Sequence, residues 1–389
     1  MANVKSILVC GAAVLTAAIA LATAALSSCC GVRQQTAGFD STLYAPEYAG
    51  GFEIMGAEGR QSVLLRVHNP WQGAEDVESE LLILRNGESA PEGFGGQVLV
   101  GEPSRIVCIS STHIALLDAA GAVEKIVGVS CMDYVSNQYV AANRHRIGDV
   151  GYEGNINYEL LLALEPDLVM LYGLNGASSM EDKLRELGVP FVYVGDYLEE
   201  SPLGKAEWIV AVGEIVGRRE VAESVYREIP RRYNELKARV AGAGVEAPAV
   251  MVNTPYGDSW FMSPVTSFVA QTIADAGGRY IYDKNTTTRS LPIDLEEAAL
   301  LVSKADFWIN TGAVGSLDAL KRGLPKFADA ECVRRGNVWN CDARTNAAGG
   351  NDFWESGIVH PDIILRDLVT IFHPELVPDT ETVYYRRLQ

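Results

Sequence analysis

The stretch PSRIVCISSTHIALLDAAGAVEKIVGVS, residues 103–130, contains the pattern that decides the fold. The β-branched run IVCIS at 106–110 predicts a strand, and the following pattern HIALLDAAG predicts a helix that ends at Gly121. A second short apolar run, KIVGVS at 125–130, predicts another strand. A strand, a helix and a strand in succession form a βαβ unit, in which the two strands lie parallel in one sheet.

The same alternation continues further along the chain. It runs through LVMLYG at 168–173 and PFVYVG at 190–195, and it restarts at APAVMVN, residues 247–253, and DFWINTG, residues 306–312. Residues 201–242 lie between these two blocks and show sustained helical spacing without strand signals, with Pro230 expected to kink the helix. We therefore predict an α/β protein of two lobes, each with a mostly parallel central sheet flanked by helices, joined by a long helix.

The expected organisation is a signal peptide over residues 1–28, a linker and small β-rich extension over 29–100, an N-terminal lobe over 101–200, a connecting helix over 201–242 and a C-terminal lobe over 243–389. The order of helix, turn and buried strand at 157–173 returns at 294–312, as expected for two similar lobes. Open α/β sheets bind ligands beyond the carboxyl ends of their strands, so a cleft between the lobes is the expected site.

The N-terminus carries an export pattern. Residues 7–26 contain no charged side chain, and Lys5 precedes them, as in secretory signals. A membrane-spanning anchor is the alternative, because 20 apolar residues can cross a bilayer. Leu26-Ser27-Ser28-Cys29 resembles the lipobox of bacterial lipoproteins, in which cleavage leaves an acylated cysteine. We predict lipidation at Cys29 and a membrane-anchored lipoprotein of the periplasm.

Composition restricts the partners. The chain has 50 acidic and 32 basic residues, a formal net charge of −18, which argues against nucleic-acid binding because phosphate contacts need a basic face. After Cys29, five cysteines remain: Cys30, Cys108, Cys131, Cys332 and Cys341. Export permits disulfides, so pairing of Cys332 with Cys341 or of Cys108 with Cys131 stands beside buried free thiols as an alternative. No cysteine and histidine spacing indicates zinc.

The motif order resembles the helix-linked, class III substrate-binding proteins of ABC importers for ferric siderophores, haem and vitamin B12. The matching stretches are residues 103–130, 156–173, 184–195 and 213–229, together with the lipobox, and the likeness covers residues 101–375. The resemblance implies two rigid lobes, an ABC permease as partner and a bulky metal chelate as cargo. It also implies a monomer with no resident cofactor, since the metal belongs to the cargo.

In the family, one glutamate on each lobe pairs with arginines of the permease. The first-lobe motif, Asn-x-Glu before Pro-Asp, matches Asn157-Tyr158-Glu159. In the second lobe Glu297 is the best match, with Glu296 adjacent and the spacing to Ala305 one residue longer. Acidic residues that only favour the helix dipole are the alternative interpretation. Glu159 and Glu297 are the predicted docking residues.

A large chelate needs aromatic walls and a few convergent polar groups. The residues that follow predicted strands or lie in Gly-rich loops are Thr112, His113, Tyr134, Tyr152, Trp260, Arg289 and Trp354, and these are the predicted ligand contacts. Haem would need an axial tyrosine or histidine, and His113 and His145 are possible histidines. A ferric catecholate would need clustered arginines, for which Arg144, Arg146, Arg289 and Arg344 are available. The predicted loops contain several aromatic residues and no dense cluster of basic residues. This composition favours a corrinoid or haem over a trianionic siderophore.

The sequence also bears on two other function classes. The chain has no GxSxG, HExxH or GxxxxGK[ST] motif, and no nucleophile and base are paired in sequence, so we do not expect an enzyme. A lipid-anchored ligand-binding or sensing module without a transporter has the same sequence features as a transport protein, and it stays open as the alternative function.

Overall fold

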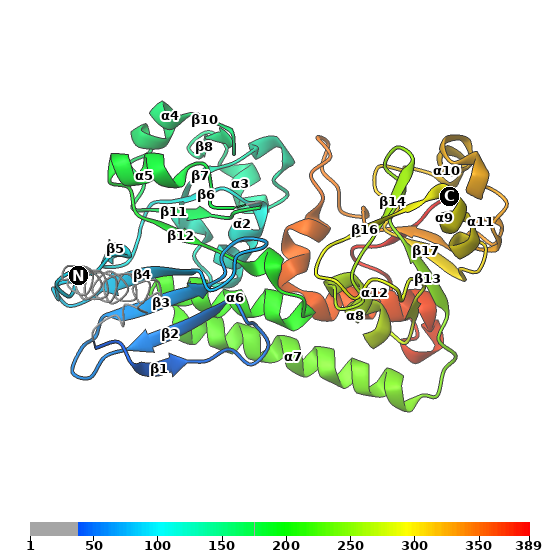
Figure 1. Cartoon of the computed structure of the whole chain (residues 1–389), viewed down its shortest axis with the longest axis horizontal. Helices are drawn as coiled ribbons and strands as arrows, with labels where there is room; N and C mark the ends of the chain where they lie inside the picture. Colours follow the sequence, from blue (N-terminus) through cyan, green and yellow to red (C-terminus); the bar gives the residue numbers. More distant parts are fainter. Residues whose placement is uncertain (1–37, 175) are drawn as a thin grey trace, which may run out of the picture.

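A computed structural model describes residues 38–174 and 176–389, and the predicted signal segment, Cys29 and Cys30 lie outside these residues. Within the described chain, no helix combines the length and the apolar character needed to cross a membrane. The two predicted lobes are visible side by side, with the helical connection along their base (Figure 1).

The N-terminal lobe contains a five-stranded sheet in the order β12-β11-β6-β7-β8, in which every neighbouring pair is parallel. Its strands are β6 (Ile106–Cys108), β7 (Ile126–Val129), β8 (Gly148–Asp149), β11 (Leu168–Leu171) and β12 (Phe191–Tyr193). Its helices are α2 (Ser111–Ala119), α3 (Gln138–Ala142), α4 (Tyr158–Ala163) and α5 (Glu181–Leu187), and a small hairpin adds β9 (Gly151–Tyr152) and β10 (Asn155–Ile156). The βαβ unit predicted at residues 103–130 is therefore confirmed.

The C-terminal lobe repeats this architecture. Its sheet has the order β15-β13-β17-β18-β19, parallel except for the last pair. The strands are β13 (Ala249–Val252), β15 (Arg279–Tyr280), β17 (Phe307–Ile309), β18 (Val338–Asn340) and β19 (Arg386–Arg387), and a separate hairpin pairs β14 (Ser259–Met262) with β16 (Leu291–Asp294). Its helices are α8 (Phe268–Asp275), α9 (Leu295–Val302), α10 (Leu317–Gly323), α11 (Glu331–Arg334) and α12 (Pro361–Phe372). The predicted fold class of two mostly parallel sheets is confirmed.

The prediction of one connecting helix over residues 201–242 is wrong. The segment forms two helices, α6 (Pro202–Ile215) and α7 (Arg219–Gly242), and Pro230 lies inside α7 without ending it. Gly217 separates them in the left-handed region, at φ 72°, and the Glu102 carboxylate occupies the space where a Cβ of residue 217 would lie. Helix α7 alone runs along the base from one lobe to the other (Figure 1).

Helix α6 differs from an ordinary surface helix because it is buried on all sides. Every residue of α6 except Lys205 is buried, although the helix includes the charged residues Glu207 and Glu214. One side faces α2 of the N-terminal lobe, and another faces β2 of the N-terminal extension. A helix that is apolar on all sides must be packed against other elements on all sides. The N-terminal lobe covers the side that faces α2, and the extension covers the side that faces β2.

The extension is a five-stranded sheet in the order β1-β2-β3-β4-β5. Its strands are β1 (Ser41–Tyr44), β2 (Phe52–Gly56), β3 (Val63–His68), β4 (Glu78–Leu84) and β5 (Gln97–Val100), with only the β4–β5 pair parallel. One face contributes to the main core, and the other face buries a small cluster made by Phe39, Met55, Leu64, Leu82 and Leu84. The β-rich character predicted for this segment is confirmed.

A buried carboxylate in α6 attaches the extension. Glu207, 1% exposed, accepts hydrogen bonds from the Tyr44 hydroxyl at 2.7 Å and from the backbone N–H groups of Glu47, Tyr48 and Ala49 at 2.7–2.8 Å. A buried charge is tolerated where hydrogen-bond donors surround it. The loop between β1 and β2 is thus held directly on α6.

The main core extends through more than one lobe. It contains Ile54 of the extension, Val107 of the N-terminal lobe, Trp208 of α6 and Val252 of the C-terminal lobe. A second core is confined to the C-terminal lobe and includes Trp260. The lobes therefore share packed side chains at their base, which is where α6 and α7 lie.

Candidate ligand-binding site

The two sheets face each other through the loops that follow their strands. Residues 131–137 follow β7, and residues 346–355 belong to a long loop after β18. Hydrogen bonds join these loops across the gap between the lobes, including one from the Ser136 N–H to a Glu355 carboxylate oxygen at 2.7 Å. The loops at the carboxyl ends of both sheets therefore meet between the lobes. The space beside them, called the cleft below, is where this architecture is expected to bind a ligand.

A second set of contacts joins the C-terminal lobe to the start of α6 and the residues just before it. The Thr266 hydroxyl of the C-terminal lobe donates to Glu200 at 2.9 Å, and the Lys205 ammonium lies 5.6 Å from the centre of the Phe268 ring. These contacts lie where α8 meets α6. They join the two lobes beside the connecting helix α6.

Exposed aromatic side chains follow strands of both sheets. Tyr134 follows β7 and Tyr152 follows β8 in the first lobe, and both are more than half exposed. In the second lobe Tyr256, 83% exposed, follows β13, and Trp354, 55% exposed, lies in the loop after β18. Tyr134, Tyr152 and Trp354 are among the predicted contacts, and Tyr256 is a further candidate that the sequence analysis did not name.

The prediction of Trp260 as a ligand contact is wrong. Its side chain is fully buried, its indole N–H donates to the Val252 carbonyl at 2.9 Å, and its ring packs against Trp308 and Phe327. Side chains alternate along a strand, and in β14 the positions of Trp260 and Met262 face the core. Trp260 is a core residue and does not contact a ligand in the cleft.

His113 is also incorrectly predicted. It lies in α2 among the apolar residues Ile114 and Leu117, is fully buried, and belongs to no exposed wall of the cleft. Burial lowers the pKa of its imidazole to about 3, so the side chain is neutral near neutral pH. The helical period that places residues 114 and 117 in the core also buries residue 113.

Thr112 lies in the first turn of α2, just beyond the carboxyl end of β6. Its half-buried hydroxyl donates to Asp196 at 3.2 Å, and burial raises the pKa of that carboxyl to about 6. Arg289 lies in an exposed loop before β16, where its backbone carbonyl accepts a hydrogen bond from the Asn285 amide at 2.8 Å. Both residues stay proposed contacts.

Replacing Trp260 by alanine is expected to destabilise the fold by about 3–5 kcal/mol, because it removes a large ring from a packed core. Replacing Tyr256 is expected to change stability by less than about 0.5 kcal/mol, because that side chain is exposed. Urea unfolding of the two variants measures this difference. Equal losses of stability would contradict the assignment of Trp260 to the core and of Tyr256 to the surface.

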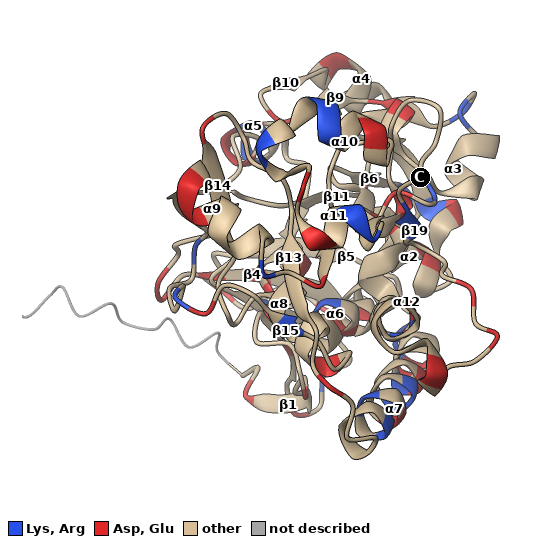
Figure 2. Ribbon diagram, turned by 90° about the vertical axis from the view of Figure 1, so that its right-hand side faces the viewer, with Lys and Arg blue, Asp and Glu red and all other residues tan. Residues whose placement is uncertain are grey.

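Three of the four arginines considered for an anionic ligand, all except Arg289, already have partners. Arg144 pairs with Asp133, and Arg344 pairs with Asp352 at 2.7 Å. The Arg146 guanidinium lies 5.5 Å from the centre of the Tyr139 ring. In the view of Figure 2, basic and acidic residues are interspersed along the ribbon, and α7 carries both. The described residues form no dense basic cluster at the cleft.

The predicted docking residues lie at two corresponding helix starts. Asn157 caps α4 by accepting from the Leu160 N–H, and Asp294 caps α9 by accepting from the Glu297 N–H. Counted from these caps, the residue of α9 that corresponds to Glu159 is Glu296, one residue before the predicted Glu297. The two helices are aligned by their cap residues, Asn157 and Asp294. Counting residues to the next strand, as the sequence analysis did, instead selected Glu297.

Exposure also separates the two glutamates of α9. Both form ion pairs at 2.5 Å, Glu296 with Lys326 and Glu297 with Lys284, but the Glu296 side chain is 77% exposed and the Glu297 side chain only 35%. Glu159 is exposed. A carboxylate that meets a basic partner must be accessible, so Glu296 is the more accessible of the two candidates in the second lobe.

The four described cysteines are free thiols. Cys332 belongs to the core of the C-terminal lobe, whereas Cys341 belongs to the main core, so the two do not pair across a hairpin. Burial raises the pKa of Cys332 to about 11 and that of Cys341 to about 12. Cys108 and Cys131 are likewise unpaired. Among the described residues, no group of three or more His, Cys, Asp or Glu side chains is arranged to hold a metal ion.

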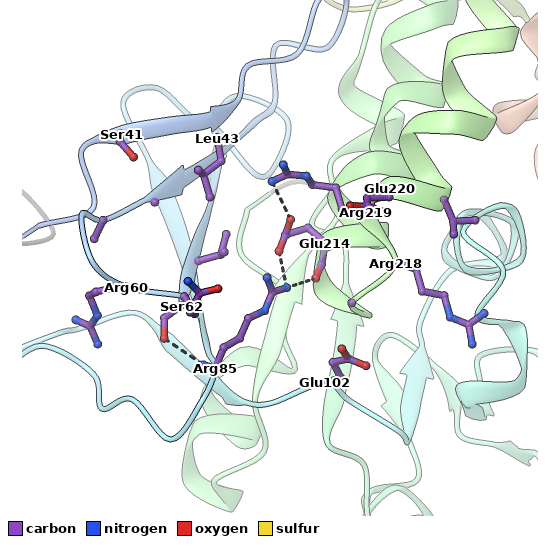
Figure 3. A pocket seen from close by; sticks show the side chains of 16 residues that line it. Ser41, Leu43, Arg60, Ser62, Arg85, Glu102, Glu214, Arg218, Arg219 and Glu220 are labelled. Carbon is purple, nitrogen blue, oxygen red and sulfur yellow. Dashed lines mark hydrogen bonds and ion pairs between the residues drawn. The ribbon is translucent and has the colours of Figure 1, made fainter.

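A cavity of about 690 Å³ lies between the extension and the turn from α6 to α7 (Figure 3). At its centre the buried Glu214 accepts from Arg85 at 2.5 Å and from Arg219 at 3.3 Å. Its lining comes from the extension, Glu102 and the two connecting helices, and includes no residue of the interlobe loops. The cavity is therefore separate from the cleft, and the charges at its centre pair with one another.

Comparison with known proteins agrees with this architecture. Residues 106–345 match the periplasmic binding protein family, and the chain belongs to that family. The family predicted from the motif order is thus confirmed. It is a family of binding proteins rather than one defined by a catalytic activity.

Three relatives illustrate the likeness. An uncharacterized lipoprotein of Methanocaldococcus jannaschii is 27% identical over 342 residues, 82% of this chain and 80% of the relative. The crystal structure of a periplasmic haem-binding protein from Pseudomonas aeruginosa superposes with a TM-score of 0.57 at 20% identity, covering 74% of this chain and 98% of that one. A periplasmic vitamin B12-binding protein of Vibrio cholerae gives a TM-score of 0.50 at 17% identity, covering 69% and 96%. At these identities the solved structures show a shared fold.

Proposed function

We propose that the chain is the lipid-anchored substrate-binding protein of an ABC importer and that it holds a bulky metal chelate between its lobes. The observation that carries this proposal is the pair of facing sheets, whose following loops expose Tyr134 and Tyr152 on one lobe and Tyr256 and Trp354 on the other. Exposed aromatic rings on opposite walls suit a large, flat, apolar ligand. The haem and vitamin B12 proteins that share the fold support the same ligand class.

Charge narrows the ligand class. A ferric catecholate carries several negative charges and needs cations that are free to meet it. Arg144 and Arg344 are paired with carboxylates, and Arg146 lies against an aromatic ring. A haem, whose porphyrin faces are apolar, or a cobalamin, whose many amide groups carry no charge, needs fewer free cations than a trianionic siderophore and fits this site better.

Absorbance titration with cyanocobalamin, haemin, a ferric hydroxamate and a ferric catecholate tests the proposal. We expect saturable binding of cyanocobalamin or haemin with a Kd of about 1 μM or tighter and at least tenfold weaker binding of the catecholate. Tyr256→Ala and Trp354→Ala should each weaken binding at least tenfold, whereas Phe261→Ala, which removes an exposed ring from β14 of the same lobe, should not. Failure to bind any of the four chelates would contradict the proposed ligand class.

Delivery to a permease is the second part of the proposal. Lipidation at Cys29 would tether the protein outside the cytoplasmic membrane, which agrees with the lipoprotein relative. Glu159 and Glu296 would meet basic side chains of the transporter, with Glu297 as the neighbouring candidate. A ligand-binding or sensing module without a transporter would not need these glutamates, so uptake measurements distinguish the two functions.

A further inference from the structure

Asn346 connects the two lobes through its side-chain amide. Its oxygen accepts from the N–H groups of Ala348 and Gly350 at 3.0 and 2.9 Å and so shapes its own loop. Its nitrogen donates across the cleft to the carbonyls of Asp133 and Val135 at 3.0 and 3.1 Å. A single side chain thus organises one loop and holds it to the other lobe.

The backbone at Gly350 completes a close fit between the loops. The position that a Cβ of residue 350 would take is occupied by the carbonyl oxygen of Tyr134, so only glycine permits this approach. The Gly350 carbonyl accepts from the Ser136 hydroxyl at 3.3 Å. The contact therefore depends on backbone as well as side-chain geometry.

Glu355 closes the other end of this contact. Its carboxylate is 2% exposed and accepts from the Ser136 N–H at 2.7 Å. The charged groups that face it are Asp352 on its own loop, which pairs with Arg344, and Asp118 on α2. The negative charges of Asp352 and Asp118 repel a carboxylate at Glu355 and so favour its protonated form.

We propose that residues 131–137 and 346–355 form a clasp that closes one side of the cleft, presents Tyr134 and Trp354 together to the ligand, and loosens as the pH rises from acidic to neutral. Tyr134 and Trp354 belong to opposite halves of the clasp. A ligand that binds both rings therefore binds a surface that forms only when the clasp is closed. This role in ligand binding rests on the proposed function, whereas the clasp itself rests on the interlobe hydrogen bonds.

The pH dependence follows from Glu355. Burial raises the pKa of its carboxyl from 4.5 to about 7 in the closed clasp. An open clasp would return the group to water and to its ordinary pKa, so the closed form binds the proton more tightly. The stabilisation of the closed clasp by this group is complete below about pH 4.5 and is lost as the pH rises to about 7.

Hydrogen exchange at the Ser136 backbone amide in the ligand-free full chain tests the clasp, because this amide donates to Glu355. We expect its protection, relative to the intrinsic rate at each pH, to be at least tenfold greater at pH 5 than at pH 7.5. Glu355→Gln should remove this pH dependence, because the amide does not ionise. Glu331→Gln, at an exposed helix start in the same lobe, should preserve it.

Asn346→Ala should lower Ser136 protection at least tenfold at both pH values. Asn337→Ala, which removes a hydrogen bond to Asp306 within the C-terminal lobe, should leave it unchanged. If Asn346→Ala preserves protection, the clasp is absent. If protection in the original chain does not vary with pH, or still varies in Glu355→Gln, the assigned pH response is wrong.

Ligand titration then tests the coupling to the cleft. Cyanocobalamin and haemin should bind Asn346→Ala at least tenfold more weakly than they bind the original chain. If the original chain binds neither probe, the proposed preference for a cobalamin or a haem fails while the exchange result still tests the clasp. Binding of equal strength to both proteins would contradict the role of the clasp in the ligand surface.

Discussion

Reversing the charge at both Glu159 and Glu296 to arginine is expected to reduce ligand uptake by cells at least tenfold. Both side chains are exposed at corresponding helix starts, one on each lobe. The two arginines would repel the basic surface proposed for the permease, and like charges brought together at an interface cost several kcal/mol. Uptake of the labelled chelate in cells that produce each variant at equal levels measures the effect.

The single variants separate the candidates on the second lobe. Glu296→Arg should reduce uptake more than Glu297→Arg, because Glu297 is half-buried whereas Glu296 is exposed. Glu331→Arg at the start of α11 serves as an exposed control and should have no effect. Ligand affinity of the purified variants should be unchanged. Normal uptake by the Glu159→Arg/Glu296→Arg protein would favour a sensing or storage role without a transporter.

Replacing Glu207 by alanine is expected to lower the free energy of unfolding by about 3–5 kcal/mol. The substitution leaves the N–H groups of Glu47, Tyr48 and Ala49 and the Tyr44 hydroxyl without their acceptor. A fully buried donor that loses its partner costs about 1–3 kcal/mol. These four donors lie on half-buried or exposed residues, so each is expected to cost about 1 kcal/mol, and the costs are not fully additive. Urea unfolding followed by tryptophan fluorescence measures the loss.

Glu228→Ala is the matched control for Glu207→Ala. The Glu228 side chain is half exposed on α7 and pairs with Arg231, and surface ion pairs contribute about 0–1 kcal/mol. A stability loss at Glu207 as small as that at Glu228 would contradict the attachment of the extension through this carboxylate. A large loss would show that the extension and α6 unfold together.

The alternation of strands and helices could be predicted because its signals are local. Short β-branched runs such as those of β6 and β7 are separated by a helical pattern and by Gly121, and each element lies where its residues indicate. The break between α6 and α7 has a weaker signal. Gly217 is compatible with a helix, and it ends one here because the chain adopts a positive φ with Glu102 packed against it.

Side-chain direction limited the prediction of the site. Tyr256 and Trp260 lie four residues apart in one polar loop and hairpin, and composition does not say which ring faces the core. The pairing of β14 with β16 decides this, because it directs Trp260 and Met262 inward. Likewise, Glu296 and Glu297 are equivalent in sequence, and only the cap at Asp294 assigns the register.

Helix α6 has a consequence for how relatives of this protein are recognised. A homologue without the additional sheet would expose the corresponding helix to water along one stripe, and selection would then fill that stripe with polar residues. Conversely, a relative whose counterpart of α6 is apolar except for glutamates at the positions of Glu207 and Glu214 would be expected to contain the additional sheet, which packs on α6 as a third layer. The residues of that one helix can therefore divide the family into two- and three-layered members.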